Sequence, residues 1–167
     1  MAVTFTKINQ GDIPHRIKWL NDPEVSQYLG HRVRIGTDEK FHQEWFAKYK
    51  TDKSREIFTI KADGKKIGQV GLLDINLLDK NASLYIMIGE KDYWQKGFGT
   101  KALEFILDYG FNELKLHKIW LDVHAENLPA IKLYQKFGFT EEGRFKDQIR
   151  HGDKFTTELR LAKINPY

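Results

Sequence analysis

The segment DYWQKGFGTKALEFILDYGF, residues 92–111, combines two closely spaced glycines with nearby lysines and a long apolar run. Gly97 and Gly99 let a ligand approach the backbone closely, because glycine has no side chain. The first N–H groups of a helix have no partner within the helix, and the helix dipole makes that end positive. The segment therefore predicts a phosphate site at a helix start, with Lys96 adding charge. A flexible strand-to-helix turn is the alternative interpretation, since short glycine motifs often match by chance.

A second segment, ENLPAIKLYQKFGF at 126–139, carries a phenol and an amide that could take part in chemistry. The phenol of Tyr134 has an ordinary pKa of about 10, so it stays protonated at neutral pH and can donate a proton. Asn127 suits the N-cap of the following helix, and its amide can also hydrogen-bond a ligand. Each residue also has an alternative interpretation without chemistry: Tyr134 as a packed aromatic side chain and Asn127 as a helix cap alone.

Composition limits the class of protein. A chain of 167 residues with 41% hydrophobic and 30% charged residues suits one soluble globular domain, which we expect to span residues 1–167. No apolar run reaches the ~20 residues of a membrane span, and the first residues lack a secretory signal, so we expect a cytoplasmic protein without membrane contact. The chain has no cysteine, and its six histidines show no HxxxH or HxH spacing, so we expect no metal site.

The charge pattern argues against two further classes. The net charge is +4, but lysines and arginines are spread among acidic residues, whereas a nucleic-acid-binding protein would gather them on one face. The GFGTK segment lacks the G-K-[ST] ending of a phosphate-binding loop in nucleotide triphosphatases. An anionic small ligand accounts for the excess charge as well as a nucleic acid does.

Periodicity predicts the elements that position these residues. Period-two alternation predicts strands at 3–8, 55–62, 66–78, 82–89 and 118–126 and a final hairpin of 143–150 and 155–164. Helices are predicted at 14–20, at 22–29, from an N-cap at Thr37, from 98 to about 113, and from 127 to 137. Phe41, Trp45 and Tyr49 recur every four residues and predict a core-facing stripe. The order indicates an α/β fold, a mixed sheet with helices on both faces.

Three segments together, IMIGEKDYWQKGFGTKAL, HKIWLDVHAEN and ENLPAIKLYQKFGF, resemble the GNAT superfamily of acyl-CoA-dependent N-acyltransferases. The last one meets every fixed position of the family's N-x-x-A-x-x-L-Y-x-K-x-G-F signature. WLNDPEV and the LHKIWLDVHAENLPAIKLY block are similar to the ribosomal-protein and diamine N-acetyltransferase branch. The resemblance covers essentially the whole chain. It implies an α/β (α+β) GNAT fold with a mixed, mostly antiparallel twisted sheet of about seven strands, splayed central strands, and acetyl-CoA as cosubstrate.

The resemblance also assigns site residues by position. It implies that the pyrophosphate of coenzyme A is held by Trp94, Gln95, Lys96, Gly97, Phe98, Gly99 and Thr100, and that Asn127 and Lys136 also contact the cofactor. It implies Ile86, Met87 and Ile88 as backbone partners of the pantetheine arm, with the N–H of Met87 or Ile88 polarising the carbonyl, and Tyr134 as proton donor to the leaving thiolate. Trp94 stands where the family usually has Arg or Gln, so a side-chain contact is not expected there.

The general base stays open in the sequence. Ser83 occupies a position where several relatives of the family carry a glutamate, and a serine hydroxyl is too weak a base at neutral pH. Asp74, Asp122, His124 and Glu126 are the candidates, acting through water. An acceptor amine of lowered pKa would need no dedicated base.

Basic side chains gather in the two segments expected to form the acceptor pocket, YLGHRVRIG and DQIRHGDKF: His31, Arg32, Arg34, Arg150 and His151. A diamine would need carboxylates there, so this charge favours an acceptor with negative charge, such as a nucleotide-linked amino sugar or an acidic peptide N-terminus. Solvated surface arginines are the alternative. A non-catalytic CoA-binding regulatory module is the second hypothesis for the whole chain, and a homodimer is left open.

Overall fold

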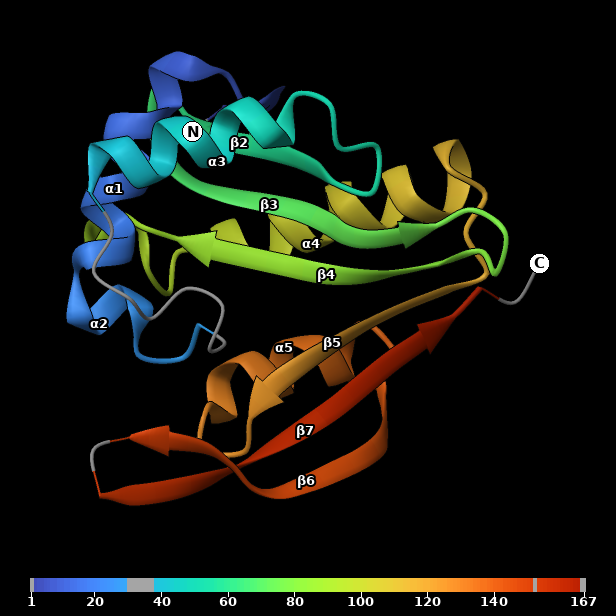
Figure 1. The fold of residues 1–167 in the computed structure, drawn as a ribbon. Helices are drawn as coiled ribbons and strands as arrows, with labels where there is room; N and C mark the ends of the chain where they lie inside the picture. Colours follow the sequence, from blue (N-terminus) through green and yellow to red (C-terminus); the bar gives the residue numbers. More distant parts are fainter. Residues whose placement is uncertain (1, 30–37, 152, 166–167) are drawn as a thin grey trace.

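The computed structural model describes residues 2–29, 38–151 and 153–165, which form one seven-stranded sheet with helices on both faces (Figure 1). The strand order is β1-β2-β3-β4-β5-β7-β6. Neighbouring strands are antiparallel except for β4 and β5, which are parallel. The strands are β1 (Val3–Lys7), β2 (Glu56–Ala62), β3 (Lys65–Asn76), β4 (Asn81–Ile88), β5 (Lys118–His124), β6 (Thr140–His151) and β7 (Lys154–Ile164).

Alternate residues of the strands feed two separate cores. Ile57 of β2 packs with Ile13 and Phe46 on the side of α1 (Ile13–Asn21), α2 (Pro23–Ser26) and α3 (Glu39–Tyr49). Its neighbour Phe58 packs on the opposite side, in the larger core under α4 (Phe98–Asp108) and α5 (Leu128–Lys136). Fully burying a large aliphatic side chain such as Leu103 of α4 stabilises the fold by roughly 1.5–3 kcal/mol. The predicted strands and the two-faced arrangement are therefore confirmed.

The start and the buried stripe of α3 differ from the prediction. Thr37 lies outside the described residues, and the N-cap is Asp38, whose carboxylate accepts from the N–H of Phe41 at 2.8 Å. Phe41 was predicted to face the core but is 50% exposed, and the buried side chains of α3 are His42 and Phe46. Trp45 and Tyr49 are partly buried against the cluster of Ile13, Phe46 and Ile57, so the predicted stripe is confirmed for these two residues and wrong for Phe41.

The buried imidazole of His42 carries no charge at neutral pH. Burial, and then the positive charge of Arg16, lower its pKa to about 4. The guanidinium of Arg16 lies 4.1 Å from the centre of the Trp45 ring and donates to the side chain of Gln69. These contacts join α1, α3 and β3 on one face of the sheet.

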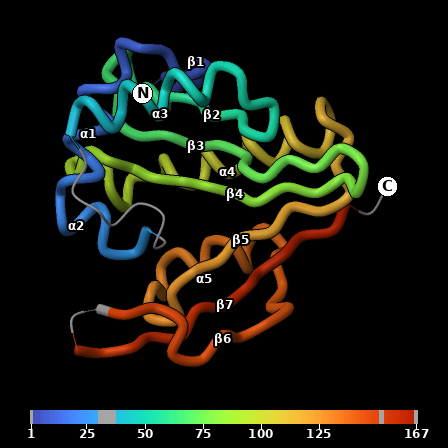
Figure 2. Tube along the Cα trace, viewed as in Figure 1, coloured from blue at the N-terminus to red at the C-terminus, as the bar shows by residue number. Residues whose placement is uncertain are grey.

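The two central strands diverge after a short stretch of pairing. Asn81, Ala82 and Ser83 of β4 pair with Lys118, Ile119 and Trp120 of β5, and no further pairs join the two strands. Beyond that point β4 continues to Ile88 and β5 to His124, so a gap opens between them, as Figure 2 shows. We call this gap the wedge and its closed end, at Ser83 and Trp120, the vertex.

Two absences apply to the part of the chain that the structure describes. In residues 2–29, 38–151 and 153–165, no helix combines the length and the apolar character that crossing a membrane requires. Within the same ranges, no group of three or more His, Asp or Glu residues is arranged to hold a metal ion.

Candidate active site

The wedge opens into a cavity of about 930 Å³ that runs from the start of α4 to β7. Most residues predicted to bind the cofactor line it: Ile86, Met87, Ile88, Trp94, Gln95, Gly97, Phe98, Gly99, Thr100 and Asn127. The predicted proton donor Tyr134 lines it as well. Lys96 and Lys136 are exposed and do not line the cavity. The predicted acceptor residues His31, Arg32 and Arg34 lie outside the described residues.

The register of β4 decides which of its main-chain groups face the wedge. The N–H of Gly89 donates to the carbonyl of Ile67 in the β3 direction at 2.8 Å. In an antiparallel ladder the next residue that bonds to the same neighbour is two positions away, so the main-chain groups of Met87 belong to β3. The main-chain N–H and carbonyl groups of Ile86 and Ile88 therefore point into the wedge, where β5 no longer pairs with β4. The register contradicts the prediction for Met87 as a backbone partner, whereas Ile86 and Ile88 keep that role as predictions.

The start of α4 has the features expected of an anion site. Gly97 is its N-cap with φ of 82°, and no side chain caps the helix. The left-handed backbone favours glycine, and a Cβ placed on Gly97 would meet no atom within 4 Å, so the space beside it is open. The carbonyl of Gly97 receives the first helical bond, from Lys101 at 3.1 Å. Phe98, Gly99 and Thr100 line the cavity, and their N–H groups precede that first helical bond, as in a helix N-terminus that can bind a diphosphate.

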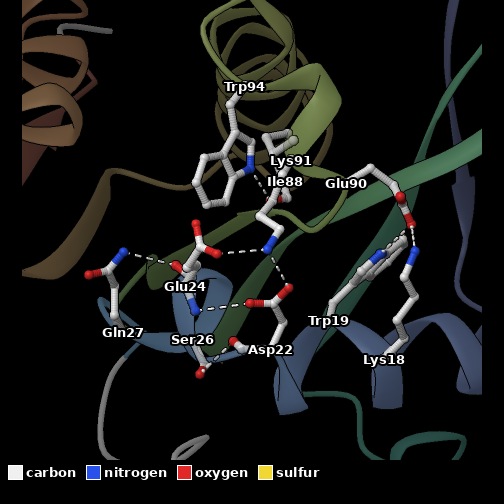
Figure 3. Close-up of polar contacts among 10 residues, drawn as sticks. All are labelled: Lys18, Trp19, Asp22, Glu24, Ser26, Gln27, Ile88, Glu90, Lys91 and Trp94. Atoms are coloured by element: carbon white, nitrogen blue, oxygen red, sulfur yellow. Dashed lines mark hydrogen bonds and ion pairs between the residues drawn. The ribbon is translucent and has the colours of Figure 1, made fainter.

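Trp94 forms part of the cavity wall on the side of α1 and α2. Its indole N–H donates to the carbonyl of Ile88 at 2.7 Å (Figure 3). The ring packs against the cluster of Trp19, Leu20, Val25 and Met87. Figure 3 shows the indole N–H directed at Ile88, the last residue of β4.

Removing this indole hydrogen bond should lower stability measurably. We expect Trp94→Phe to lower the free energy of unfolding by about 1 kcal/mol, which corresponds to a Tm lower by roughly 2–4 °C in a domain of this size. Calorimetric melting measures this. Tyr93→Phe is the control, because Tyr93 packs on Phe98 through its ring. Equal melting temperatures for Trp94→Phe and the wild type would show that the Ile88 contact adds nothing.

Ion pairs tie the segment between β4 and α4 to the first helices. Lys91 bridges Asp22 at 3.0 Å and Glu24 at 2.9 Å, and hydrogen bonding to Lys91 lowers the pKa of Asp22 (Figure 3). Glu90 accepts from Lys18 at 2.7 Å and from the indole of Trp19 at 2.9 Å. The anion site and the α1–α2 wall are therefore held in a fixed relation.

Tyr134 and Asn127 come from α5, on the same side of the sheet as α4. The ring of Tyr134 packs 5.7 Å from that of Phe139, and burial raises the pKa of its phenol to about 12. The hydroxyl therefore stays protonated throughout the physiological pH range and can donate a proton. The side-chain oxygen of Asn127 caps α5 by accepting from the N–H of Ala130 at 3.4 Å. Its amide nitrogen is a further donor on a residue that lines the cavity.

The opposite side of the wedge, towards α1 and α2, is acidic. Leu121 and Val123 of β5 face the α4–α5 core, so Trp120 and Asp122 face the other way. Leu159 and Leu161 of β7 likewise leave Glu158 and Arg160 on that side. The carboxylates that line the cavity are Glu24, Asp74, Asp122 and Glu158. Arg160 also lines it, but its Nε and Nη2 each donate to Asp122 at 2.8 Å, and its guanidinium lies 4.1 Å from the centre of the Trp120 ring.

The structure separates the four base candidates. Asp74 and Asp122 line the cavity, whereas Glu126 is exposed and does not. His124 is buried, contacts the Tyr28 ring at 5.8 Å and does not line the cavity. Sequence reasoning missed Glu158, a 6% exposed carboxylate in the wall. Alternation along β7 would have placed it opposite the leucines, but only the pairing of β7 with β5 brings it to the wedge.

Comparison with known proteins defines the class. The family model described as "Acetyltransferase (GNAT) domain" matches residues 2–140, so the chain belongs to the GNAT acetyltransferase family. The resemblance found in the sequence, including the seven-stranded fold, is confirmed.

Similar proteins include spermidine N-acetyltransferases. Spermidine N(1)-acetyltransferase of Escherichia coli strain K12 is 34% identical over 117 residues, which cover 70% of this chain and 62% of that protein. The chain thus spans less than two thirds of the length of this relative. The Vibrio cholerae enzyme of the same name is 31% identical over 148 residues, 88% of this chain and 84% of that protein. A crystal structure of spermidine N-acetyltransferase from Vibrio cholerae in complex with CoA and spermine superposes with a TM-score of 0.90 at 27% identity, covering 97% of this chain and 95% of that one.

Proposed function

We propose that this protein transfers the acetyl group of acetyl-CoA directly to a primary amine of a small polycation, in a ternary complex. The observation that carries the acceptor class is the wall facing α1 and α2, where Glu24, Asp74, Asp122 and Glu158 line the cavity. Among the described residues that line the cavity, Arg160 is the one with a positive charge, and Asp122 binds it in two hydrogen bonds. Coulomb attraction therefore favours a cationic acceptor. The similarity to spermidine acetyltransferases points the same way.

The cavity residues suit the cofactor side of this reaction. The N–H groups at 97–100 would bind the diphosphate, and the wedge-facing main chain of Ile86 and Ile88 would pair with the pantetheine arm. Bound acetyl-CoA supplies an activated thioester. The N–H of Ile86 or Ile88 would stabilise the negative charge that develops on the carbonyl oxygen. Tyr134 would give its phenolic proton to the leaving sulfur.

The expectation of an anionic acceptor is not supported by the described wall. Arg150 is exposed, lies 3.9 Å from Asp153, and does not line the cavity. Counting basic residues in a segment could not show which side chains face the cavity, whereas the strand register does. His31, Arg32 and Arg34 keep their substrate-binding role as an untested prediction, since they lie outside the described residues.

A thiol-release assay tests the proposed function. Acetyl-CoA would be offered with spermidine, spermine, diamines, monoamines, amino sugars and an acidic peptide N-terminus. We expect the highest kcat/KM for the polyamines, with a value that falls as salt screens the acidic wall. A preference for the acidic peptide would overturn the acceptor class. Tight acetyl-CoA binding without thiol release for any amine would instead favour a non-catalytic CoA-binding module.

Glu158 offers a separate test of polycation binding. Its β5 partner His124 is four residues from Trp120 at the vertex, a distance of roughly 13 Å along an extended strand. We propose that Glu158 binds an ammonium remote from the reacting one. Glu158→Gln should raise KM for a polyamine about tenfold, because a charged hydrogen bond is worth about 1.5 kcal/mol or more. KM for a monoamine should change less than twofold, as measured by steady-state kinetics.

The control for this variant is Glu141→Gln. Glu141 is an exposed carboxylate on β6 that pairs with Arg144 at 3.1 Å and does not line the cavity. It should leave both KM values unchanged. Equal increases for polyamine and monoamine in Glu158→Gln would argue for a general disturbance of the cavity and against a remote ammonium site.

We further propose a cytoplasmic location, which fits the cosubstrate and a chain without cysteine. Cell fractionation would test it. Light scattering would decide whether the protein is the homodimer that the sequence left open.

A further inference from the structure

The vertex of the wedge holds a carboxylate that comes from a neighbouring strand. The hydroxyl of Ser83, at the last β4–β5 pair, lies 3.2 Å from Oδ2 of Asp74 on β3 and 3.2 Å from the carbonyl of Leu73. Ser83 is 8% exposed, and both Ser83 and Asp74 line the cavity. The single O–H of Ser83 can be donated to either acceptor, so the carboxylate lies within its reach at the point where the two strands begin to separate.

An irregularity in β3 presents Asp74 to the cavity. The β3–β4 register is interrupted between Leu73 and Asn76, and Asp74 has φ of 51°, in the left-handed region. Such a backbone costs on the order of 1 kcal/mol for a residue other than glycine, although aspartate tolerates it better than most. The N–H of Ile75 donates to the carbonyl of Ser54 at 2.9 Å, which fixes the irregular segment from its other side. Bulges of this kind redirect side chains next to functional sites.

The other carboxylates of the wall are engaged elsewhere or lie far from the vertex. Both oxygens of Asp122 accept from Arg160. Glu24 is exposed on α2 and pairs with Lys91 at 2.9 Å. Glu158 is roughly 13 Å from the vertex along β5, at about 3.3 Å for each of four residues. Asp74 is the lining carboxylate that lies at the vertex itself, within hydrogen-bond distance of Ser83, and this position selects it.

We propose that Asp74, oriented by Ser83, is the catalytic base that deprotonates the acceptor amine; this inference rests on the proposed function. The carboxylate takes one proton from the ammonium, which leaves a neutral amine. The nitrogen lone pair forms the C–N bond to the acetyl carbonyl, the C–S bond breaks, and the sulfur keeps its electron pair and takes the proton of Tyr134. A proton from the new amide nitrogen returns to the Tyr134 oxygen through solvent, and Asp74 releases its proton to solvent. One proton is released in each turnover.

Asp74→Asn tests this role without disturbing the local backbone. Asparagine tolerates the left-handed conformation and its side-chain oxygen can still accept from Ser83, but a carboxamide is not a base. With spermidine we expect kcat/KM to fall 10²–10³-fold, while the Kd for acetyl-CoA from calorimetry stays within twofold. Ser83→Ala, which removes the orienting hydroxyl, should cost a smaller factor of about 3–10. Asp108→Asn, an exposed carboxylate at the far end of α4, is the control and should match the wild type.

A second acceptor separates a base from a structural group. In a polyamine analogue with two or three fluorines on the carbon β to its terminal amine, assayed above the lowered pKa of that amine, the amine is largely neutral and needs no base. The loss caused by Asp74→Asn should then be at least tenfold smaller than with spermidine. Equal losses for both acceptors, or an Asp74→Asn variant within threefold of the wild type with spermidine, would overturn the inference. A wild type that releases no thiol with any amine would instead overturn the proposed function.

Discussion

Replacing Tyr134 with phenylalanine should lower kcat by about 10²–10³-fold and leave the Kd for acetyl-CoA within twofold. The reason is that the phenol would act only when the sulfur leaves, so its loss removes proton donation without removing a binding contact. The ring and its packing on Phe139 remain in the variant. Steady-state thiol release with a polyamine and calorimetric titration of acetyl-CoA measure the two quantities.

The control for this variant is Tyr109→Phe. Burial also raises the pKa of the Tyr109 phenol, but this residue packs against Phe58 and Phe105 and does not line the cavity. We expect wild-type kcat from it. A Tyr134→Phe variant with kcat close to that of the wild type would remove the phenol from the mechanism.

As the proposed proton donor, Tyr134 should also determine how kcat depends on alkaline pH, because its pKa is raised. The proton-donating form is present below the pKa and is lost as pH rises through about 12. Ionisation of this phenol should therefore cause no decline of kcat between about pH 7 and pH 10, even though an ordinary tyrosine ionises at about 10. A pH–rate profile of the wild type with a saturating amine measures this.

A negative charge introduced at Gly97 should weaken acetyl-CoA binding more than an uncharged side chain of the same size does. Gly97→Asp and Gly97→Asn add side chains of nearly equal size at a left-handed position that both residues tolerate. We expect the Kd for acetyl-CoA to rise about tenfold in the asparagine variant and at least ~10³-fold in the aspartate variant. Two like charges about 4 Å apart near a protein surface repel by about 4 kcal/mol. Calorimetric titration of both variants gives the comparison.

Thermal melting of the same pair guards against a folding defect. A carboxylate at a helix N-terminus stabilises the free protein by about 0.3–1 kcal/mol, so the aspartate variant should melt no lower than the asparagine variant. Equal Kd values for the two variants would mean that the diphosphate does not bind at the start of α4.

Features decided by local backbone requirements were predictable from the sequence. Gly97 was predicted at a helix start and has positive φ, as has Gly138, which directly follows the helix predicted from 127 to 137. Asn127 was predicted as an N-cap and caps α5. The predicted strands are present because alternation records which face of a sheet is buried. Each of these depends on a residue and its near neighbours along the chain.

Features decided by distant pairing were not predictable. The main chain of Met87 faces β3 and not the wedge because of the β3–β4 register, which depends on residues far from Met87 in the sequence. The acidic wall combines carboxylates from α2, β3, β5 and β7, and no single segment contains them. The expectation of an anionic acceptor was drawn from basic residues close in sequence, and the described wall does not support it. Asp74 was one of four candidates until its contact with Ser83 at the vertex set it apart.

A crystal structure of this protein with bound CoA would test the central claim most directly. The account predicts the diphosphate within hydrogen-bond distance of the N–H groups at 97–100, the pantetheine arm beside Ile86 and Ile88, and the sulfur next to the hydroxyl of Tyr134. A diphosphate bound elsewhere, or a wedge left empty with the start of α4 facing only solvent, would contradict it.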